Sequence, residues 1–97
     1  MLNKQFTVYI LTSAQNTVLY TGVTNNLVRR ILEHRSGQTE CFTKKYRIHK
    51  LVYFEVFPNA YDAIMWEKKI KAGSRLKKIK LIQATNPDWR DLSVNLL

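Results

Sequence analysis

The first residues able to do chemistry lie in a segment with the periodicity of an amphipathic helix. Residues 27–36 place four side chains at the i, i+3, i+4, i+7 spacing of one inward stripe: Leu27, Arg30, Ile31 and His34. A guanidinium and an imidazole therefore share the side that should be apolar. Alternatively, Arg30 extends to solvent along its aliphatic stem, and His34 is a partly buried histidine with satisfied hydrogen bonds.

A second helical segment repeats this anomaly with the opposite charge. Its inward stripe consists of Ala63, Ile64, Glu67, Ile70 and Lys71. Burying an unpaired carboxylate is costly, so Glu67 requires a cationic partner or a metal ion. A structural salt bridge from Glu67 to Arg30 or to a lysine is the alternative to a metal site.

Two tyrosines on matching strands complete the set of candidate residues. The phenols of Tyr9 and Tyr20 can point at the same pocket, although each can equally be an ordinary sheet tyrosine. We expect five side chains to converge over one face of the sheet: Tyr9, Tyr20, Arg30, His34 and Glu67. Such a combination can grip a phosphate, hold a divalent ion and activate water.

The elements that must position these residues follow in the order ββαβαα. Strands are expected at 6–11, 19–23 and 50–57, and helices at about 26–36, 59–73 and 74–84. This order lacks the strand-helix-strand repeat that builds large parallel sheets. The predicted fold class is α+β, an α/β sandwich in which helices flank a three-stranded, mainly antiparallel sheet. One domain spans residues 1–97, with its core at about 5–84.

Capping residues support the helix boundaries. Asn25 or Asn26 can cap the first helix, which Gly37 is placed to end in a left-handed conformation. Asn59, which follows a strand-ending proline, opens the second helix, and Ser74 caps the third. A polar loop is expected at 38–47.

The charge balance predicts an anionic partner. The 97-residue chain has 16 Lys and Arg against 7 Asp and Glu, a formal net charge of +9, so a polyanion is the natural ligand. Many small proteins are basic without binding anything specific, but here the charges are clustered, with aromatic residues between them. Such clusters suit a groove that tracks phosphates. The cationic residues expected to contact nucleic acid are Lys44, Lys45, Arg47, Lys68, Lys69, Lys77, Lys78 and Lys80.

Other features of the sequence narrow the class of protein. The longest apolar runs are far too short to span a membrane, and the N-terminus lacks the apolar region of a signal peptide. We therefore expect a soluble, cytoplasmic protein without a membrane partner. The single cysteine, Cys41, forms neither an internal disulfide nor a zinc site.

The motifs around the candidate residues resemble those of the GIY-YIG nuclease family. Thr7-Val8-Tyr9 is followed after ten residues by Tyr20-Thr21-Gly22, then by the segment 26–30, His34 and finally Glu67. The similarity covers nearly the whole chain. It is closest to small stand-alone bacterial members of an uncharacterised protein family, which are related to the nuclease domain of structure-specific junction nucleases.

The resemblance implies a role for each matching residue. Tyr9 and Tyr20 correspond to the two motif tyrosines, Arg30 to the catalytic arginine and Glu67 to the single metal-binding carboxylate. His34 falls where relatives carry a histidine or tyrosine near the scissile phosphate. Gly22 matches the motif glycine that permits a close approach of backbone and substrate.

Two positions depart from the family pattern. Thr7 replaces the first motif's glycine, which is a common relaxation. Val23 stands where the excision-repair relatives have a lysine next to the second tyrosine, so cationic help from that position is missing.

The implied activity is that of a divalent-metal-dependent endonuclease, a phosphodiester hydrolase acting on the DNA backbone with little sequence specificity. Glu67 would hold one Mg²⁺ or Mn²⁺, and Arg30 would fork onto the non-bridging oxygens. Tyr20 is the general base by analogy, with His34 as the alternative, because a free phenol has a pKa near 10 whereas imidazole titrates near neutrality. The relation to junction nucleases extends the expectation to structure-selective cleavage in DNA repair or recombination.

Two other classes of function are compatible with a basic domain of this size. One is a non-catalytic nucleic-acid-binding module, and the other is an accessory protein that presents a basic surface to RNA or to a protein. A binder has no need for a carboxylate within a cationic cleft, so the joint presence of the five candidate residues favours the enzyme. No required protein partner is evident from the sequence.

Overall fold

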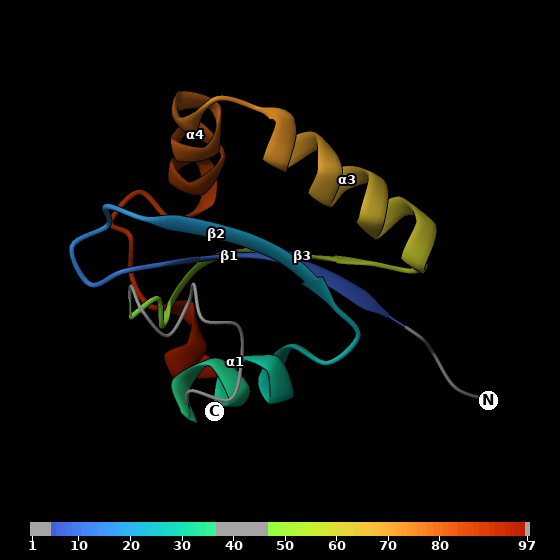
Figure 1. The fold of residues 1–97 in the computed structure, drawn as a ribbon, viewed down its shortest axis with the longest axis horizontal. Helices are drawn as coiled ribbons and strands as arrows, with labels where there is room; N and C mark the ends of the chain where they lie inside the picture. The colour runs from blue at the N-terminus through green and yellow to red at the C-terminus, as the bar shows by residue number, and fades with distance from the viewer. Residues whose placement is uncertain (1–4, 37–46, 97) are drawn as a thin grey trace.

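A three-stranded antiparallel sheet forms the middle layer of the molecule in the computed structural model, which describes residues 5–36 and 47–96 (Figure 1). Its strands are β1 (Phe6–Thr12), β2 (Leu19–Thr24) and β3 (Lys50–Phe57), in the spatial order β2-β1-β3. Both pairings of β1 are antiparallel. Because β1 is central, β2 forms one edge of the sheet as the described residues build it.

Helices cover both faces of this sheet. Helix α1 (Leu27–Ser36) and the short 3₁₀ helix η1 (Leu92–Asn95) lie on one side, and α3 (Ala60–Ala72) and α4 (Arg75–Thr85) lie on the other (Figure 1). The predicted fold class and the order ββαβαα are confirmed, with element boundaries within one or two residues of the prediction. The helix η1 was not expected, and buried side chains extend to Ser93. Within the described residues no helix is long and apolar enough to cross a membrane.

Side-chain caps fix the helix starts as the sequence predicts. The Asn26 side chain accepts a hydrogen bond from the Arg29 amide at 3.1 Å, so Asn26 rather than Asn25 caps α1. Asn59 accepts from the backbone of α3 at 2.8 Å, and Ser74 accepts from that of α4 at 3.2 Å. Each cap satisfies a backbone amide that has no partner within the helix. Gly37 lies outside the described residues.

The alternation of β1 divides the interior into two apolar clusters. Val8 and Ile10 pack with residues of α3 and α4, whereas Tyr9 and Leu11 pack with Ile31 of α1. Successive side chains of a strand point to opposite faces, so the sheet separates these two clusters. Tyr9 therefore belongs to the layer between the sheet and α1.

A polar anchor ties the end of α1 to the C-terminal segment. Arg35 donates to the carboxylate of Asp91 at 3.1 Å, and that carboxylate also accepts from the backbone amides of Leu51 and Ser93. Burial raises the pKa of Asp91, but the hydrogen bonds and the charge of Arg35 outweigh it, so the pKa lies below its ordinary value. This anchor fixes the helical turn that carries His34.

Candidate active site

The phenol of Tyr9 lies at the centre of the candidate site because the opposite residue has no side chain. Tyr9 pairs with Gly22 across β1 and β2, and only 1% of Tyr9 is exposed. A Cβ at position 22 would lie 2.5 Å from the Tyr9 Oη atom and 2.6 Å from Cζ. The close approach of this ring to β2 therefore requires glycine.

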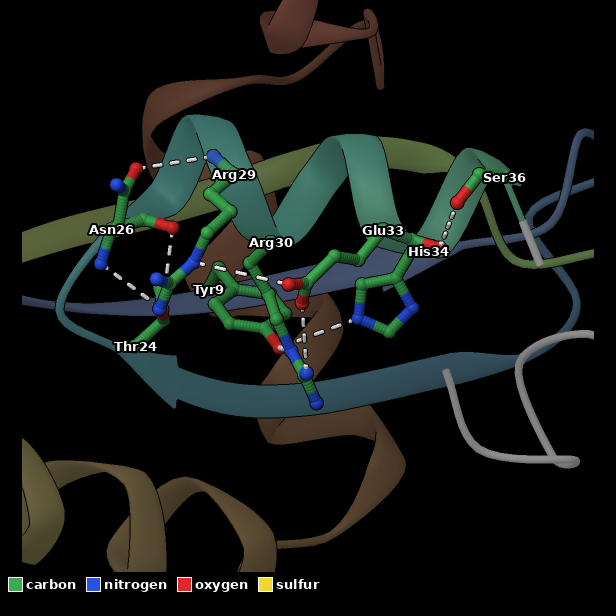
Figure 2. Close-up of polar contacts among 8 residues, drawn as sticks. All are labelled: Tyr9, Thr24, Asn26, Arg29, Arg30, Glu33, His34 and Ser36. Carbon is green, nitrogen blue, oxygen red and sulfur yellow. Dashed lines mark hydrogen bonds and ion pairs between the residues drawn. The ribbon is translucent and has the colours of Figure 1, made fainter. Parts of the chain in front are cut away.

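Arg30 reaches the same phenol from α1. Its Nε donates to Tyr9 Oη at 3.3 Å, and one terminal nitrogen forms an ion pair with Glu33 at 3.3 Å (Figure 2). The hydrogen bond to Tyr9 is the largest cause of the raised pKa of Arg30; burial opposes it, and hydrogen bonds to Glu33 and Tyr20 add to it. The guanidinium is thus held in place as a permanent, partly exposed cation.

Two further rings close the cluster around Tyr9. His34 Nε2 lies 3.5 Å from Tyr9 Oη, and the His34 side chain is 1% exposed. The ring of Tyr20 packs edge-on to His34, with centroids 5.6 Å apart, and lies 6.5 Å from that of Tyr9. Two tyrosines, a histidine and an arginine predicted from the sequence are therefore brought together between the sheet and α1.

A hollow of about 290 Å³ opens beside the guanidinium. Its polar walls come from the end of β2 and from α1, where Arg30 and Glu33 line it. The apolar walls are Phe6, Val23 and Ile64, the last of which belongs to α3. Residues from both helical layers thus meet at the edge strand β2, and a ligand in this hollow would contact Arg30 directly.

Glu67 does not join the other four residues in one layer. It lies on α3, which covers the opposite face of the sheet from α1 (Figure 1), and it pairs with Lys71 one turn along the helix. The expectation that all five side chains converge over one face is wrong for Glu67. The physical reason is that Ala63 and Ile70 of the same stripe cover the apolar side chains that β1 presents on that face.

Of the two salt bridges that were the alternatives to a metal site, the one from Glu67 to a lysine is present. The one from Glu67 to Arg30 is not among the ion pairs of the described residues. Arg30 pairs with Glu33, and Glu67 pairs with Lys71. The partner of Arg30 is thus Glu33, which was not predicted from the sequence. The spacing in the sequence indicates this pair, because residues three apart on a helix are neighbours and Glu33 follows Arg30 at that spacing.

The predicted nucleic-acid-binding cations lie mostly away from this cluster. Arg47 is exposed and adopts a left-handed conformation with φ of 53°. Five lysines lie on α3 and α4, the helices on the other side of the sheet: Lys68, Lys69, Lys77, Lys78 and Lys80. Lys44 and Lys45 lie outside the described residues.

The donor set for a metal ion is small in the part of the chain that the structure describes. No group of three or more His, Cys, Asp or Glu side chains lies close enough there to hold an ion. Glu67 is 8% exposed, and its partner Lys71 has a side chain that is 56% exposed. The lysine is exposed, but the carboxylate is buried, so Glu67 can give up Lys71 only in exchange for another cation. Glu67 therefore fits the role of a single protein ligand to a hard divalent ion whose other ligands are waters and phosphate.

Comparison with known proteins decides the family. The model of the GIY-YIG catalytic domain matches residues 5–80, a span that contains all the clustered residues and Glu67. The chain belongs to the GIY-YIG family. Its match is to the catalytic domain of a family of nucleases.

Relatives of this GIY-YIG chain are small proteins of similar length. A UPF0213 protein of Pediococcus pentosaceus is 42% identical over 80% of this chain and 81% of its own length. Another from Staphylococcus saprophyticus is 44% identical over 66% of this chain and 78% of its own. The solution structure of UPF0213 protein BH0048 from Bacillus halodurans has a TM-score of 0.59 and 32% identity, covering 90% of this chain and 92% of that one. The GIY-YIG fold is thus shared with stand-alone relatives.

Proposed function

We propose that this GIY-YIG protein is a divalent-metal-dependent endonuclease that hydrolyses phosphodiester bonds of DNA. The observation that carries the proposal is the fixed guanidinium of Arg30, held by Tyr9 and Glu33 at the wall of a hollow. Fixed donors aimed at a place where negative charge develops are the main source of rate acceleration in such reactions.

Arg30 binds and orients the scissile phosphate. A guanidinium has five N–H donors in a planar fork, more than its contacts with Tyr9, Tyr20 and Glu33 require. The remaining donors can take two non-bridging oxygens at once. Neutralising those oxygens lowers the repulsion that an attacking water meets.

The difference in burial between Tyr20 and His34 supports different roles for these two candidate bases. Tyr20 is half-buried, whereas His34 is 1% exposed and sits behind the two phenols. A water molecule that attacks phosphorus can therefore reach the Tyr20 oxygen more easily than the imidazole. We assign proton transfer from water to Tyr20, whose oxygen the Arg30 cation stabilises when it is negatively charged.

Tyr9 and His34 act as positioning residues. Tyr9 Oη accepts the hydrogen bond of Arg30 Nε and lies next to His34 Nε2, so it links the phosphate-binding cation to the imidazole. The His34 ring packs against both phenols. This packing holds Tyr20 in the orientation that the proton transfer requires.

Glu67 is the residue that would hold the divalent ion, with Mg²⁺ or Mn²⁺ as the candidates. When bound, such an ion neutralises phosphoryl charge and relieves charge on the departing oxygen. Glu67 would have to exchange its pairing with Lys71 for the ion, and the hollow lined by Ile64 and Arg30 connects its helix with the cluster.

DNA is the proposed partner because the chain carries a net charge of +9 and offers cations on several elements. Contacts of this kind are made to phosphates and carry little sequence information. Selectivity would then lie in DNA structure rather than in base sequence, in the setting of repair or recombination.

A cleavage assay on duplex, single-stranded, flap and junction DNAs tests the proposal, with Mg²⁺, Mn²⁺ or a chelator. We expect cleavage that requires the divalent ion and is lost in the Arg30→Ala variant. Binding of these DNAs without cleavage under every condition would identify the protein as a nucleic-acid-binding module.

A further inference from the structure

Residues of α3 and α4 form an apolar surface ringed by lysines. These two helices cover the face of the sheet opposite α1, the helix that carries Arg30 (Figure 1). A hollow of about 150 Å³ between the two helices has an almost wholly apolar lining that includes Trp66, Ile70 and Leu81. A neighbouring hollow of about 550 Å³ shares Trp66 and adds Phe57 and Met65. Trp66 thus lies where the two hollows adjoin.

Residues of β3 fix the orientation of the Trp66 indole. Its Nε1 donates to the Tyr53 hydroxyl at 3.0 Å, and that hydroxyl donates to a carboxylate oxygen of Glu55 at 2.7 Å. The ring also packs at the rim of the apolar cluster beneath α3. A ring held this way offers a stacking surface without losing side-chain freedom when a ligand arrives.

The charges around the two hollows are almost all positive. Four lysines line them against one carboxylate, that of Asp62; the lysines are Lys68, Lys69, Lys77 and Lys78. Lys69 Nζ lies 5.7 Å from the centre of the Trp66 ring and lines both hollows. A cationic rim around an aromatic floor is the arrangement by which proteins bind single strands, with phosphates on the cations and bases on the rings.

We propose that this surface, made of Trp66 with Lys69, Lys77 and Lys78, is a second nucleic-acid site that binds unpaired DNA. A duplex keeps its bases stacked inside and presents only phosphates, so it would leave the apolar floor empty. An unpaired base can enter a hollow and stack on the indole. The inference rests on the proposed function, because it takes DNA as the substrate, and it adds a preference for substrates with a single-stranded part.

The position of this site relative to Arg30 supports such a preference. Helix α3 contributes Ile64 to the hollow beside Arg30 and Trp66 to the lysine-ringed surface. Because Ile64 and Trp66 are two residues apart, they face different sides of α3. A strand that reaches both hollows would therefore cross over α3, with its unpaired part on Trp66 and its scissile phosphate at Arg30.

Fluorescence of Trp66 provides the test, because Trp89 is the other tryptophan of the chain and a Trp89→Phe background isolates the signal. The protein is titrated without metal with an oligothymidylate of about 10 nucleotides, a length within the site sizes of small single-strand-binding folds. An abasic strand and a duplex of the same length serve as comparison ligands. We expect Trp66 emission to be quenched by the oligothymidylate alone, with affinity about tenfold above that for the abasic strand, since stacking of one base contributes this much.

Two variants distinguish the contribution of base stacking to binding from that of phosphate contacts. Trp66→Leu should bind oligothymidylate and the abasic strand equally, and Lys77→Gln with Lys78→Gln should weaken both. Arg75→Gln is the matched control, because Arg75 lies on the same helix, lines neither hollow and is not among the cations expected to contact nucleic acid. If Trp66→Leu does not fold, the quenching of Trp66 in the Trp89→Phe background still tests whether a base stacks on the indole.

Equal affinity of the unsubstituted Trp66 protein for oligothymidylate and the abasic strand, or equal quenching by the duplex, would overturn the proposal. Retained oligothymidylate preference in Trp66→Leu would do the same. These outcomes concern binding without metal, so they leave the proposed nuclease activity to the cleavage assay. Loss of cleavage on every DNA with oligothymidylate binding intact would instead remove the proposed function.

Discussion

Replacing Gly22 with alanine tests whether the close approach of Tyr9 to β2 holds the site together. The added Cβ would lie 2.5 Å from Tyr9 Oη and 2.6 Å from Cζ, whereas ordinary contacts of a Cβ begin at 3.4 Å. The ring must therefore retreat by about 1 Å. Tyr9 is buried between β2 and α1, so this retreat also moves Arg30 and His34, which contact its oxygen.

The expected loss in stability follows from overpacking. Forcing extra volume into a packed interior costs about 1–3 kcal/mol. For a domain of this size each kcal/mol lowers Tm by about 4–8 °C, so we expect a fall of roughly 4–24 °C. Cleavage should fall further, because a displacement of about 1 Å in a positioned group can cost about 100-fold in rate.

Thermal unfolding followed by circular dichroism and cleavage at a temperature well below Tm measure the two effects separately. Gly73→Ala is the matched control, since its Cβ would meet a backbone oxygen at 3.3 Å and its φ of −78° suits any residue. This control should retain cleavage, because Gly73 ends α3 away from Arg30. A Gly22→Ala variant that melts and cleaves like the unsubstituted protein would refute the reasoning about Tyr9.

Three further predictions concern charged groups. Arg30→Lys keeps the positive charge but not the planar fork, so cleavage should fall by about 100-fold or more while metal-free DNA binding changes little; near-normal cleavage would reduce Arg30 to a structural role. Glu67→Gln should abolish cleavage with and without added Mn²⁺ and leave metal-free DNA binding unchanged or stronger. Glu33→Gln, the matched carboxylate control, should retain metal-dependent cleavage at a reduced rate. The reverse pattern would make Glu33 the metal ligand. The pKa of Asp91 is depressed in the folded state, so its carboxylate stabilises the fold above the unfolded pKa of about 4 and loses this effect as pH falls through the lower folded value. Asp91→Asn should therefore flatten the dependence of Tm on pH below about pH 5. An unchanged dependence of Tm on pH in that range would contradict this.

The sequence predicted the part of the site that local periodicity encodes. Helical spacing placed Arg30 and His34 on one stripe, and the predicted hairpin placed Tyr9 and Tyr20 on matching strands from which both phenols can point at one pocket. The structure brings these four side chains together. Both patterns concern one element, or two that are joined by a short turn. Their geometry is fixed by backbone repeat and pairing register, which the order of residues specifies directly.

The position of Glu67 could not be predicted in the same way. A stripe of apolar residues shows that a helix packs on something, but both faces of this sheet are apolar and both need cover. Which face α3 takes depends on the chain's path from β3 and on the space already occupied by α1 and η1. The helix η1 escaped prediction because four residues give too little periodicity to register.

The position of β2 at the edge of the sheet explains how residues from the α1 layer and the α3 layer can line one hollow. Across a central strand, side chains on opposite faces are separated by backbone that has neighbours on both sides. Within the part of the chain that the structure describes, β2 pairs with β1 on one side alone. The hollow beside Arg30 uses this opening, with Val23 and Ile64 on its wall. Val23 leaves the hollow without the lysine of the excision-repair relatives, yet Arg29 lines the same hollow from α1. A second guanidinium there can supply the missing positive charge, so the departure at Val23 is compatible with phosphate binding at this edge.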